Sequence, residues 1–310
     1  MFQLGDRCSH LVGSIGFIVR KIMHRQRRIR IELNPPAKTD DLPHYYAKIE
    51  PLLKRTSCLS LTSHPSDGIS GFERSLNLIK YIKSNQPSSS LDILFHLTCR
   101  DVDRLSLKAR LQELKDQNIK KVLIISGERY ANSCKSEHQF ENSSELLQEL
   151  INKGDHSSFD SIAIAGFPGG NGTTSTNDDE EGIRLCYRLE TGVVGSVYTQ
   201  CIFELGVFEQ FANAIKRDFG TQVELVPSIA LFENLRNLDR VVQVIRVSND
   251  VEKIRQQLSR FHEDDADAGD FSKKYLISLC QSLIDNGYEI NMCLFGHIKL
   301  ALEILDAIDK

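Results

Sequence analysis

The sequence predicts a single-domain α/β protein that folds as a (β/α)8 TIM barrel. Short β-rich runs alternate with segments of helical periodicity, which is the pattern of parallel strands joined by crossover helices. Eight such units follow one another along the 310 residues, and this number favours a closed barrel over an open sheet. Polar clusters also stand at the ends of several predicted strands, where barrels of this kind carry their working residues.

The predicted strands are rich in β-branched and apolar residues and end at polar or turn-forming residues. The first strand stops at Pro35-Pro36, because proline cannot donate to a strand ladder. The fourth is almost continuously apolar, as expected of a strand buried on both faces. The predicted strands are Arg28–Leu33, Cys58–Thr62, Ser88–Leu97, Lys121–Ser126, Ser161–Phe167, Ser196–Phe203, Gln222–Ile229 and Tyr288–Phe295.

The segments between these strands place apolar residues at helical spacing. The predicted helices are Asp40–Leu53, Gly71–Ile82, Asp101–Gln117, Ser144–Asn152, Asp178–Glu190, Phe208–Arg217, Asn234–Val244, Val251–Phe261, Phe271–Asn286 and Gly296–Ile308. We expect the acidic run Glu263–Asp270 to separate two of them. Tyr130–Asn142 is polar and irregular, which suits a long loop over a ligand.

Residues 1–27 form a basic N-terminal extension, and residues 28–310 form the predicted barrel. Between Met1 and Arg30 the sequence has one acidic residue, Asp6, and seven Lys or Arg residues. Such a segment is typical of either an organellar transit peptide or an amphipathic extension. We expect a cytoplasmic protein, with an organellar location as the alternative.

Composition excludes several classes of partner. The formal net charge of -4 gives no basic excess for binding nucleic acid, and no apolar run approaches the ~18 residues of a membrane span. Eight cysteines are scattered without a CxxC pair, so we expect buried thiols and no metal site. A homo-oligomer is compatible with this composition.

Four polar clusters follow predicted strands. They are Glu32 with Pro35-Pro36, His96-Leu97-Thr98-Cys99 with Asp101, Ser126-Gly127-Glu128, and Tyr198-Thr199-Gln200. Two carboxylates, an imidazole and an amide at one end of a barrel can perform acid–base chemistry on a polar heterocycle. Taken singly, Glu32 is equally compatible with a salt-bridged carboxylate, and His96 and Gln200 with structural hydrogen bonding.

Two further segments have features of ligand-binding sites. The run Gly169–Gly172 lacks the Lys-Ser/Thr of a phosphate loop, which favours a plain turn. Asp178–Glu181 suits the start of a helix, where negative charge complements the dipole. Arg188 lies two helical turns beyond Glu181 on the same face, so this pair marks either a surface feature or a contact to a ligand.

Together these motifs resemble the methylenetetrahydrofolate reductase family of flavin-dependent barrels, over residues 28–308. The similarity rests on the order and spacing of four short motifs. They are Glu32 with Pro35-Pro36, Leu59-Ser60-Leu61-Thr62, His96-Leu97-Thr98-Cys99 with Asp101, and Thr199-Gln200 with Phe203 and Glu204.

The resemblance implies an enzyme that binds FAD and reduces methylenetetrahydrofolate with electrons from NAD(P)H, in one-carbon and methionine metabolism. Glu32 would be the general acid, and Glu128 would tune the flavin and the folate. The implied FAD contacts are Thr62, His96, Gly127, Glu181 and Arg188. The implied substrate contacts are Gln200, Glu128 and Leu235.

The sequence also departs from the family pattern. Ser126 replaces an arginine, Glu128 an aspartate, Leu235 an aromatic residue, and His297 an asparagine. These changes leave two alternatives: a flavoprotein paralogue with another C1 carrier or electron partner, and a non-catalytic barrel that binds folate or a partner. Because the sequence ends just after the last predicted helix, we expect no S-adenosylmethionine-binding regulatory domain.

Overall fold

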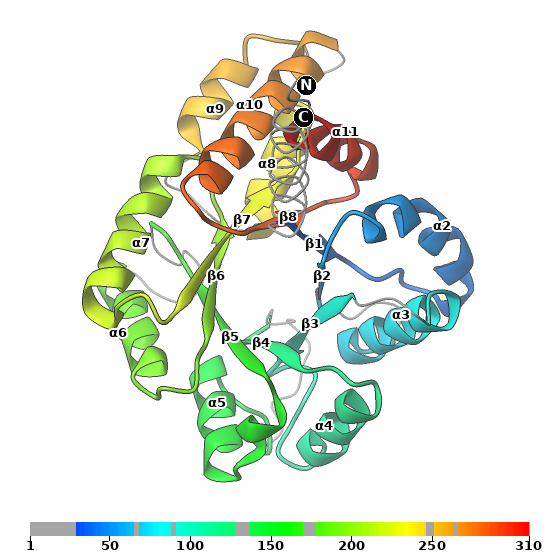
Figure 1. Cartoon of the computed structure of the whole chain (residues 1–310), viewed down its shortest axis with the longest axis vertical. Helices are drawn as coiled ribbons and strands as arrows, with labels where there is room; N and C mark the ends of the chain where they lie inside the picture. Colours follow the sequence, from blue (N-terminus) through cyan, green and yellow to red (C-terminus); the bar gives the residue numbers. More distant parts are fainter. Residues whose placement is uncertain are drawn as a thin grey trace, which may run out of the picture.

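The computed structural model is a closed barrel of eight parallel strands surrounded by helices (Figure 1). It describes residues 29–64, 68–87, 91–127, 137–169, 178–245, 251–262 and 266–309. The strands pair in chain order, and β8 pairs with β1 to close the ring. The predicted fold class is therefore confirmed, while the predictions for residues 1–27 lie outside the described residues.

The strands are short and occupy the positions that the sequence predicts. They are β1 (Ile29–Leu33), β2 (Cys58–Leu61), β3 (Asp92–Thr98), β4 (Lys121–Ile125), β5 (Ser161–Gly166), β6 (Ser196–Cys201), β7 (Glu224–Ala230) and β8 (Ile290–Cys293). The helices are α2 (Leu42–Leu53), α3 (Gly71–Asn85), α4 (Leu107–Asp116), α5 (Ser143–Asn152), α6 (Asp178–Leu189), α7 (Leu205–Phe219), α8 (Leu235–Ile245), α9 (Glu252–Leu258), α10 (Ala266–Asp285) and α11 (Ile298–Ile308), with 3-10 turns η1 (Thr39–Asp41) and η2 (Asp155–Ser158).

Two predicted helix starts were wrong. Helix α4 begins at Leu107 instead of Asp101, because the Asp103 carboxylate accepts the backbone N–H groups of Leu105 and Ser106 and forms a turn. Helix α10 begins at Ala266, inside the acidic run that we expected to separate two helices. Asp267 lies in its first turn, where a negative charge is favourable at the positive end of the helix dipole.

The main hydrophobic core lies between the barrel and its helices. In β1 the alternation of the strand turns Ile29, Ile31 and Leu33 outward into this core, and each is at most 1% exposed. A smaller cluster, which includes Leu94, Leu123 and Val226, fills the interior of the barrel. The alternate residues of β1, Arg30 and Glu32, therefore face the interior, one near each end of the strand.

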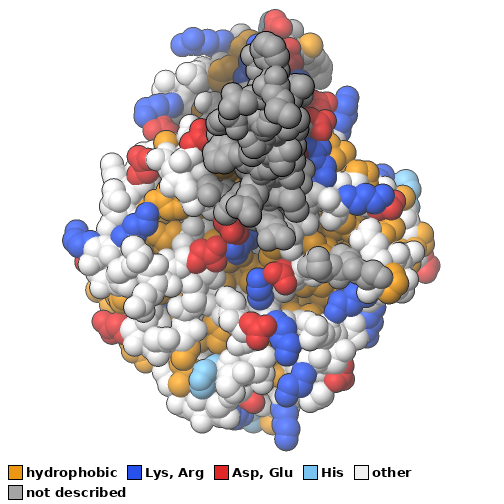
Figure 2. Space-filling view, viewed as in Figure 1, with side chains coloured by type: hydrophobic (Ala, Val, Ile, Leu, Met, Phe, Trp, Pro, Cys, Tyr) orange, Lys and Arg blue, Asp and Glu red, His pale blue; other side chains and the backbone are white. Residues whose placement is uncertain are grey.

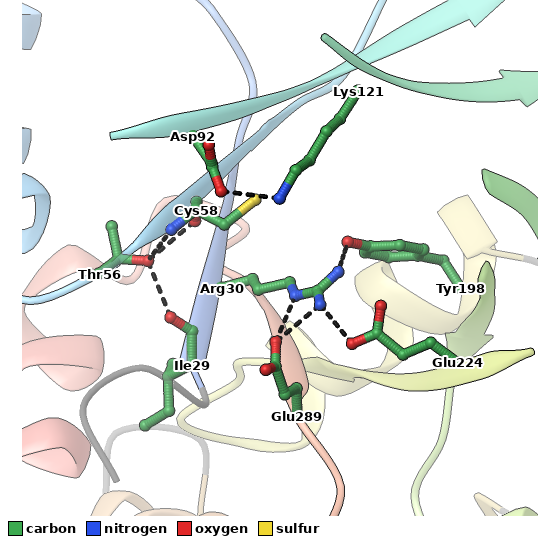
Figure 3. A network of polar contacts seen from close by, with 9 residues as sticks. All are labelled: Ile29, Arg30, Thr56, Cys58, Asp92, Lys121, Tyr198, Glu224 and Glu289. Atoms are coloured by element: carbon green, nitrogen blue, oxygen red, sulfur yellow. Dashed lines mark hydrogen bonds and ion pairs between the residues drawn. The ribbon is translucent and has the colours of Figure 1, made fainter. Parts of the chain in front are cut away.

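The amino-terminal end of the barrel is closed by a polar network centred on Arg30 (Figure 3). Its guanidinium donates to Glu289 at 2.6 and 2.9 Å, to Glu224 at 2.5 Å, and to the Tyr198 hydroxyl. Its side chain is only 12% exposed. These partners come from β6, β7 and the residue just before β8, so one largely buried cation joins β1 to three other parts of the barrel wall.

The distribution of charged side chains on the surface is consistent with the small net charge of the sequence. Figure 2 shows acidic and basic side chains interspersed over the face in view. No helix in the described part of the chain is long and apolar enough to cross a membrane. Five of the described cysteines are buried as free thiols, as the sequence suggested: Cys58, Cys99, Cys201, Cys280 and Cys293.

We predict that Arg30→Met destabilises the fold, because the change leaves Glu224 and Glu289 facing each other without their shared cation. Both carboxylates are partly exposed, so water screens part of the loss, and we expect a decrease of about 2 kcal/mol in the free energy of unfolding. Urea denaturation measures the change. Arg217→Met, at an exposed surface pair, is the control, and equal stability of the two variants would contradict the bracing role of Arg30.

Candidate functional site

Glu32 lies inside the barrel at the carboxyl end of β1. Its neighbours in register are Ser60 of β2 and Cys293 of β8. The Glu32 side chain is 20% exposed, so it is largely enclosed but still reaches the open end of the barrel. Because all strands are parallel, the carboxyl ends of β2 and β3 meet at the same place and bring the other predicted residues toward it.

The Glu32 carboxylate is held from β8. The Asn291 side-chain amide donates to Glu32 Oε2 at 2.8 Å and lies 3.1 Å from Ser228 Oγ of β7. Asn291 is 1% exposed, so this contact is shielded from water. A continuous polar chain thus runs from β7 through β8 to Glu32, across the seam where the barrel closes.

His96 of β3 stands on the other side of Glu32. Its Nε2 shares a hydrogen bond of 2.7 Å with Ser60 Oγ and lies 3.9 Å from Glu32 Oε2. Burial lowers the pKa of His96, and the nearby Glu32 only partly opposes this effect. His96 is therefore a neutral imidazole near neutral pH, and it provides a hydrogen-bonding wall next to Glu32.

The rim beyond His96 is shaped by Gly127 and Arg100. Gly127 has φ +75°, and a Cβ there would meet Arg100 Cγ at 2.9 Å and Thr98 Cβ at 3.2 Å. The aliphatic part of the Arg100 side chain thus packs directly against the backbone of Gly127. Arg100 Nε is buried and finds no acceptor among the described residues. Thr62, the predicted contact on β2, bonds through its hydroxyl to the Leu33 carbonyl at 3.3 Å.

Arg74 of α3 fixes the corner that follows Glu32. It is 7% exposed, and its guanidinium donates to the backbone carbonyls of Pro35, Pro36 and His64. These carbonyls follow β1 and β2. The loops on either side of Glu32 are therefore joined by one buried cation, which the sequence analysis did not identify.

Gln200 lies outside the regular ladder of β6. The register of β6 with β7 moves from Tyr198↔Val226 to Cys201↔Ser228, so β6 holds one extra residue and Cys201 takes the place that Gln200 would occupy in a regular strand. The Gln200 amide instead lies 3.4 Å from the Ile245 carbonyl at the end of α8. Sequence periodicity alone cannot reveal such a bulge.

Glu181 and Arg188 do meet on one face of α6, as their spacing predicts. Arg188 donates to Glu181 at 3.0 Å, to Ser143 Oγ of α5 at 3.2 Å and to the Arg184 carbonyl at 3.1 Å. The two side chains are 4% and 6% exposed, and burial lowers the pKa of Arg188 despite its partner Glu181. The pair therefore braces α6 against α5, and its role toward FAD stays a prediction.

The remaining predicted residues are less informative. Leu235 is the first residue of α8, half-buried and packed against the main core. Glu128 lies outside the described residues. No group of three His, Cys, Asp or Glu side chains in the described ranges is arranged to hold a metal ion.

The residues that the sequence analysis missed are the partners of the predicted ones. Asn291 stands between apolar neighbours in β8, and Ser228 lies in the apolar end of β7. An amide in an otherwise apolar strand is a signal that can be read from sequence, because a buried amide requires a partner. Its link to Glu32 requires the closure of the barrel, which brings together residues 259 positions apart.

Fold and site together define a (β/α)8 barrel with an enclosed carboxylate, a neutral imidazole and an amide at the carboxyl ends of its strands. A family model described as methylenetetrahydrofolate reductase matches residues 18–309, and the chain belongs to this family. The match begins inside the predicted N-terminal extension. The sequence resemblance to this family is thus confirmed.

The chain also resembles individual proteins. It is 21% identical over 282 residues to methylenetetrahydrofolate reductase 2 of Schizosaccharomyces pombe, an alignment that covers 87% of this chain and 43% of that protein. The chain thus spans less than half the length of that relative. Its fold is similar to that of a Clostridium thermocellum protein described as binding two copies of 5-methyl-5,6,7,8-tetrahydrofolic acid, with a TM-score of 0.59, 12% identity, and coverage of 94% of this chain and 99% of that one.

We predict that Arg188→Leu is strongly destabilising, because it leaves the Glu181 carboxylate buried without its cation. The free energy of unfolding should fall by about 3 kcal/mol. The double variant Glu181→Leu/Arg188→Leu should recover most of this loss, since no charge is then left unpaired. Chemical denaturation of the three proteins tests the prediction. A double variant no more stable than Arg188→Leu would contradict it.

A second prediction concerns acid sensitivity. Because burial lowers the pKa of His96, the unfolded chain binds a proton there more readily than the folded protein. The stabilisation of the fold that neutral His96 provides is complete above the pKa of this histidine in the unfolded chain. It declines as the pH falls below that pKa. From about pH 7.5 to about pH 5.5 we expect the wild type to lose about 1 kcal/mol more than His96→Gln. Denaturation at both pH values measures this difference, and His44→Gln, at an exposed position of α2, is the control. Equal losses of stability in the wild type and in His96→Gln would show that His96 is not held neutral.

Proposed function

We propose that this protein reduces 5,10-methylenetetrahydrofolate to 5-methyltetrahydrofolate, with FAD as cofactor and NAD(P)H as electron donor. The observation that carries the proposal is the Glu32 carboxyl group, enclosed at the mouth of the barrel and bonded to Asn291. Membership of the family and similarity to the S. pombe reductase support the same reaction.

The described residues on β2 to β4 fit a flavin. Gly127 offers bare backbone at the rim, and the Arg100 Nε next to it is a buried donor that finds no acceptor within the described ranges. An isoalloxazine ring, which carries several oxygen and nitrogen acceptors, matches these two features. Thr62, His96, Gly127 and Arg100 would therefore hold the ring. Arg188 uses three of its five N–H groups for Glu181, Ser143 and the Arg184 carbonyl, so its predicted contact to the polar tail of FAD would use the other two.

The protein would contribute the proton and the orientation of the substrate. Glu32 would protonate N10 of methylenetetrahydrofolate, so that the five-membered ring opens to an iminium ion. Bound FAD would supply the hydride that reduces the iminium carbon. His96 would exclude water next to Glu32 without competing for its proton. Gln200 would bind the pterin after exchanging its 3.4 Å contact to Ile245.

A folate-binding barrel without turnover is the second candidate. The displacement of Gln200 from the β6 ladder and the ion pair of Arg188 with Glu181 favour it, since both direct predicted ligand-binding side chains to partners within the protein. The similar C. thermocellum fold, described as binding a methylated reduced folate, is compatible with it as well. The two candidates differ in whether Glu32 is required for turnover or only for binding.

We predict that Glu32→Gln lowers the rate of folate reduction at least 100-fold while the protein still binds FAD, because an amide cannot donate the catalytic proton. Stopped-flow oxidation of the reduced flavin by methylenetetrahydrofolate measures this step. Glu50→Gln, on the outer surface of α2, is the control and should react like the wild type. An unchanged rate in Glu32→Gln with flavin bound would exclude Glu32 as the acid.

A further inference from the structure

The side-chain amide of Asn291 holds Glu32 but is only partly paired within the described residues. Its side-chain nitrogen has two hydrogens and faces three groups: Glu32 Oε2 at 2.8 Å, Ser228 Oγ at 3.1 Å and Cys293 Sγ at 3.6 Å. Its side-chain oxygen is buried and has no donor among the residues that the structure describes. Such an arrangement satisfies an ionised Glu32 but leaves one amide acceptor unused, which costs free energy.

Half a turn of the amide about its Cβ–Cγ bond reverses this arrangement. The oxygen would then face Glu32, Ser228 and Cys293. The hydroxyl of Ser228 and the thiol of Cys293 can each donate a hydrogen, and Glu32 can donate one only when it is protonated. The hydrogen bond with Cys201 and burial both raise the pKa of Cys293, so its thiol keeps its proton near neutral pH. The reversed amide therefore suits the acid form of Glu32.

We propose that Asn291, anchored by Ser228, is a positioning residue that donates to the Glu32 carboxylate and accepts from the Glu32 acid by reversing its amide. The proposal deepens the proposed function and rests on it, because a general acid must be held in the same place before and after it gives up its proton. The proton leaves Glu32 Oε2 for the substrate, and the Asn291 amide then turns so that its N–H donates to the carboxylate; no other bond forms or breaks at Asn291.

The charged and titratable groups around Glu32 leave this role to the amide. His96 on β3 is bonded to Ser60 and lies 3.9 Å away. The Cys293 thiol on β8 also hydrogen-bonds Glu32, but it keeps its proton, because its hydrogen bond with Cys201 of β6 and its burial both raise its pKa. Arg30, the register partner of Asn291 on β1, directs its guanidinium to Glu224, Glu289 and Tyr198 at the other end of the barrel. Asn291 is the side chain at Glu32 Oε2 that can present either a strong donor or a strong acceptor without changing its own protonation state.

Two spectroscopic measurements test the proposal without depending on turnover. Infrared difference spectra, with Glu32→Gln as reference, give the carboxylic acid band of Glu32 as a function of pH. Proteins labelled with ¹⁵N in asparagine give the side-chain signals of Asn291, assigned by their loss in Asn291→Leu. We expect these signals to change at the pH at which the Glu32 band appears, and to stay constant in Glu32→Gln.

The variants give the expected size of the effect. The bond to a carboxylate is charge-assisted and stronger than the bond to the acid, so Asn291→Leu should raise the midpoint of the infrared band by about one pH unit, a tenfold change. Ser228→Ala removes only the anchor of the amide, and it should raise the same midpoint by a smaller amount. This variant tests the proposal if Asn291→Leu does not fold. Ser278→Ala, at an exposed position of α10, is the matched control.

Asn291 signals that stay constant while the Glu32 band titrates would overturn the proposal, as would an unshifted midpoint in both variants. These outcomes are separate from failure of the proposed function. If the Asn291 signals and the Glu32 band change together but the protein does not reduce the folate, the proposal for Asn291 stands and the proposed reductase function is wrong.

Discussion

The pairing of β1 with β8 is the constraint on which the candidate site depends. Ladder hydrogen bonds between these two strands place Glu32 in register with Cys293 and Arg30 in register with Asn291. The first and last strands of the barrel thus supply both the enclosed carboxylate and the amide that holds it. The same seam supports the other end of the barrel, where Arg30 meets Glu289. Loosening this seam would disturb the site and the polar closure together, because both are built on alternate residues of one five-residue strand.

The barrel interior differs in character along its axis. At the amino-terminal end a single guanidinium gathers two carboxylates and a phenol, next to the apolar cluster of Leu94, Leu123 and Val226. At the carboxyl end the interior polar side chains include Glu32, Ser60, His96, Ser228 and Asn291. A buried polar group is costly unless it is bonded, and nearly every one of these is bonded to another member of the set. The exception, the side-chain oxygen of Asn291, lies next to the proposed acid.

The sequence predicted the fold well because the signal for each element is local. Alternation of β-rich and helical segments, repeated eight times, was sufficient for the barrel and for the strand ends that carry Glu32, Thr62 and His96. The proximity of Glu32 to His96 followed from the fold class, since the carboxyl ends of parallel strands meet. Helix starts were less predictable where a side chain competes with the backbone, as Asp103 does before α4.

The parts of the site that escaped prediction depend on register. A single extra residue in β6 moves Gln200 out of the ladder and puts Cys201 in its place, a change that leaves no trace in hydrophobic periodicity. The link from Asn291 to Glu32 likewise exists only in the closed barrel. The predicted pair Glu181 and Arg188 did come together, since helical spacing is local, but spacing could not reveal that the pair is buried between α5 and α6.

The central claim is that this barrel holds a flavin beside an acid and passes a hydride to a reduced folate. The most direct test is the visible absorption spectrum of the purified protein after incubation with FAD and removal of the excess. We predict a bound flavin spectrum that bleaches with NADH or NADPH and returns when methylenetetrahydrofolate is added. A protein that stays colourless after excess FAD is removed, yet binds the folate, would contradict the claim and favour the barrel without turnover.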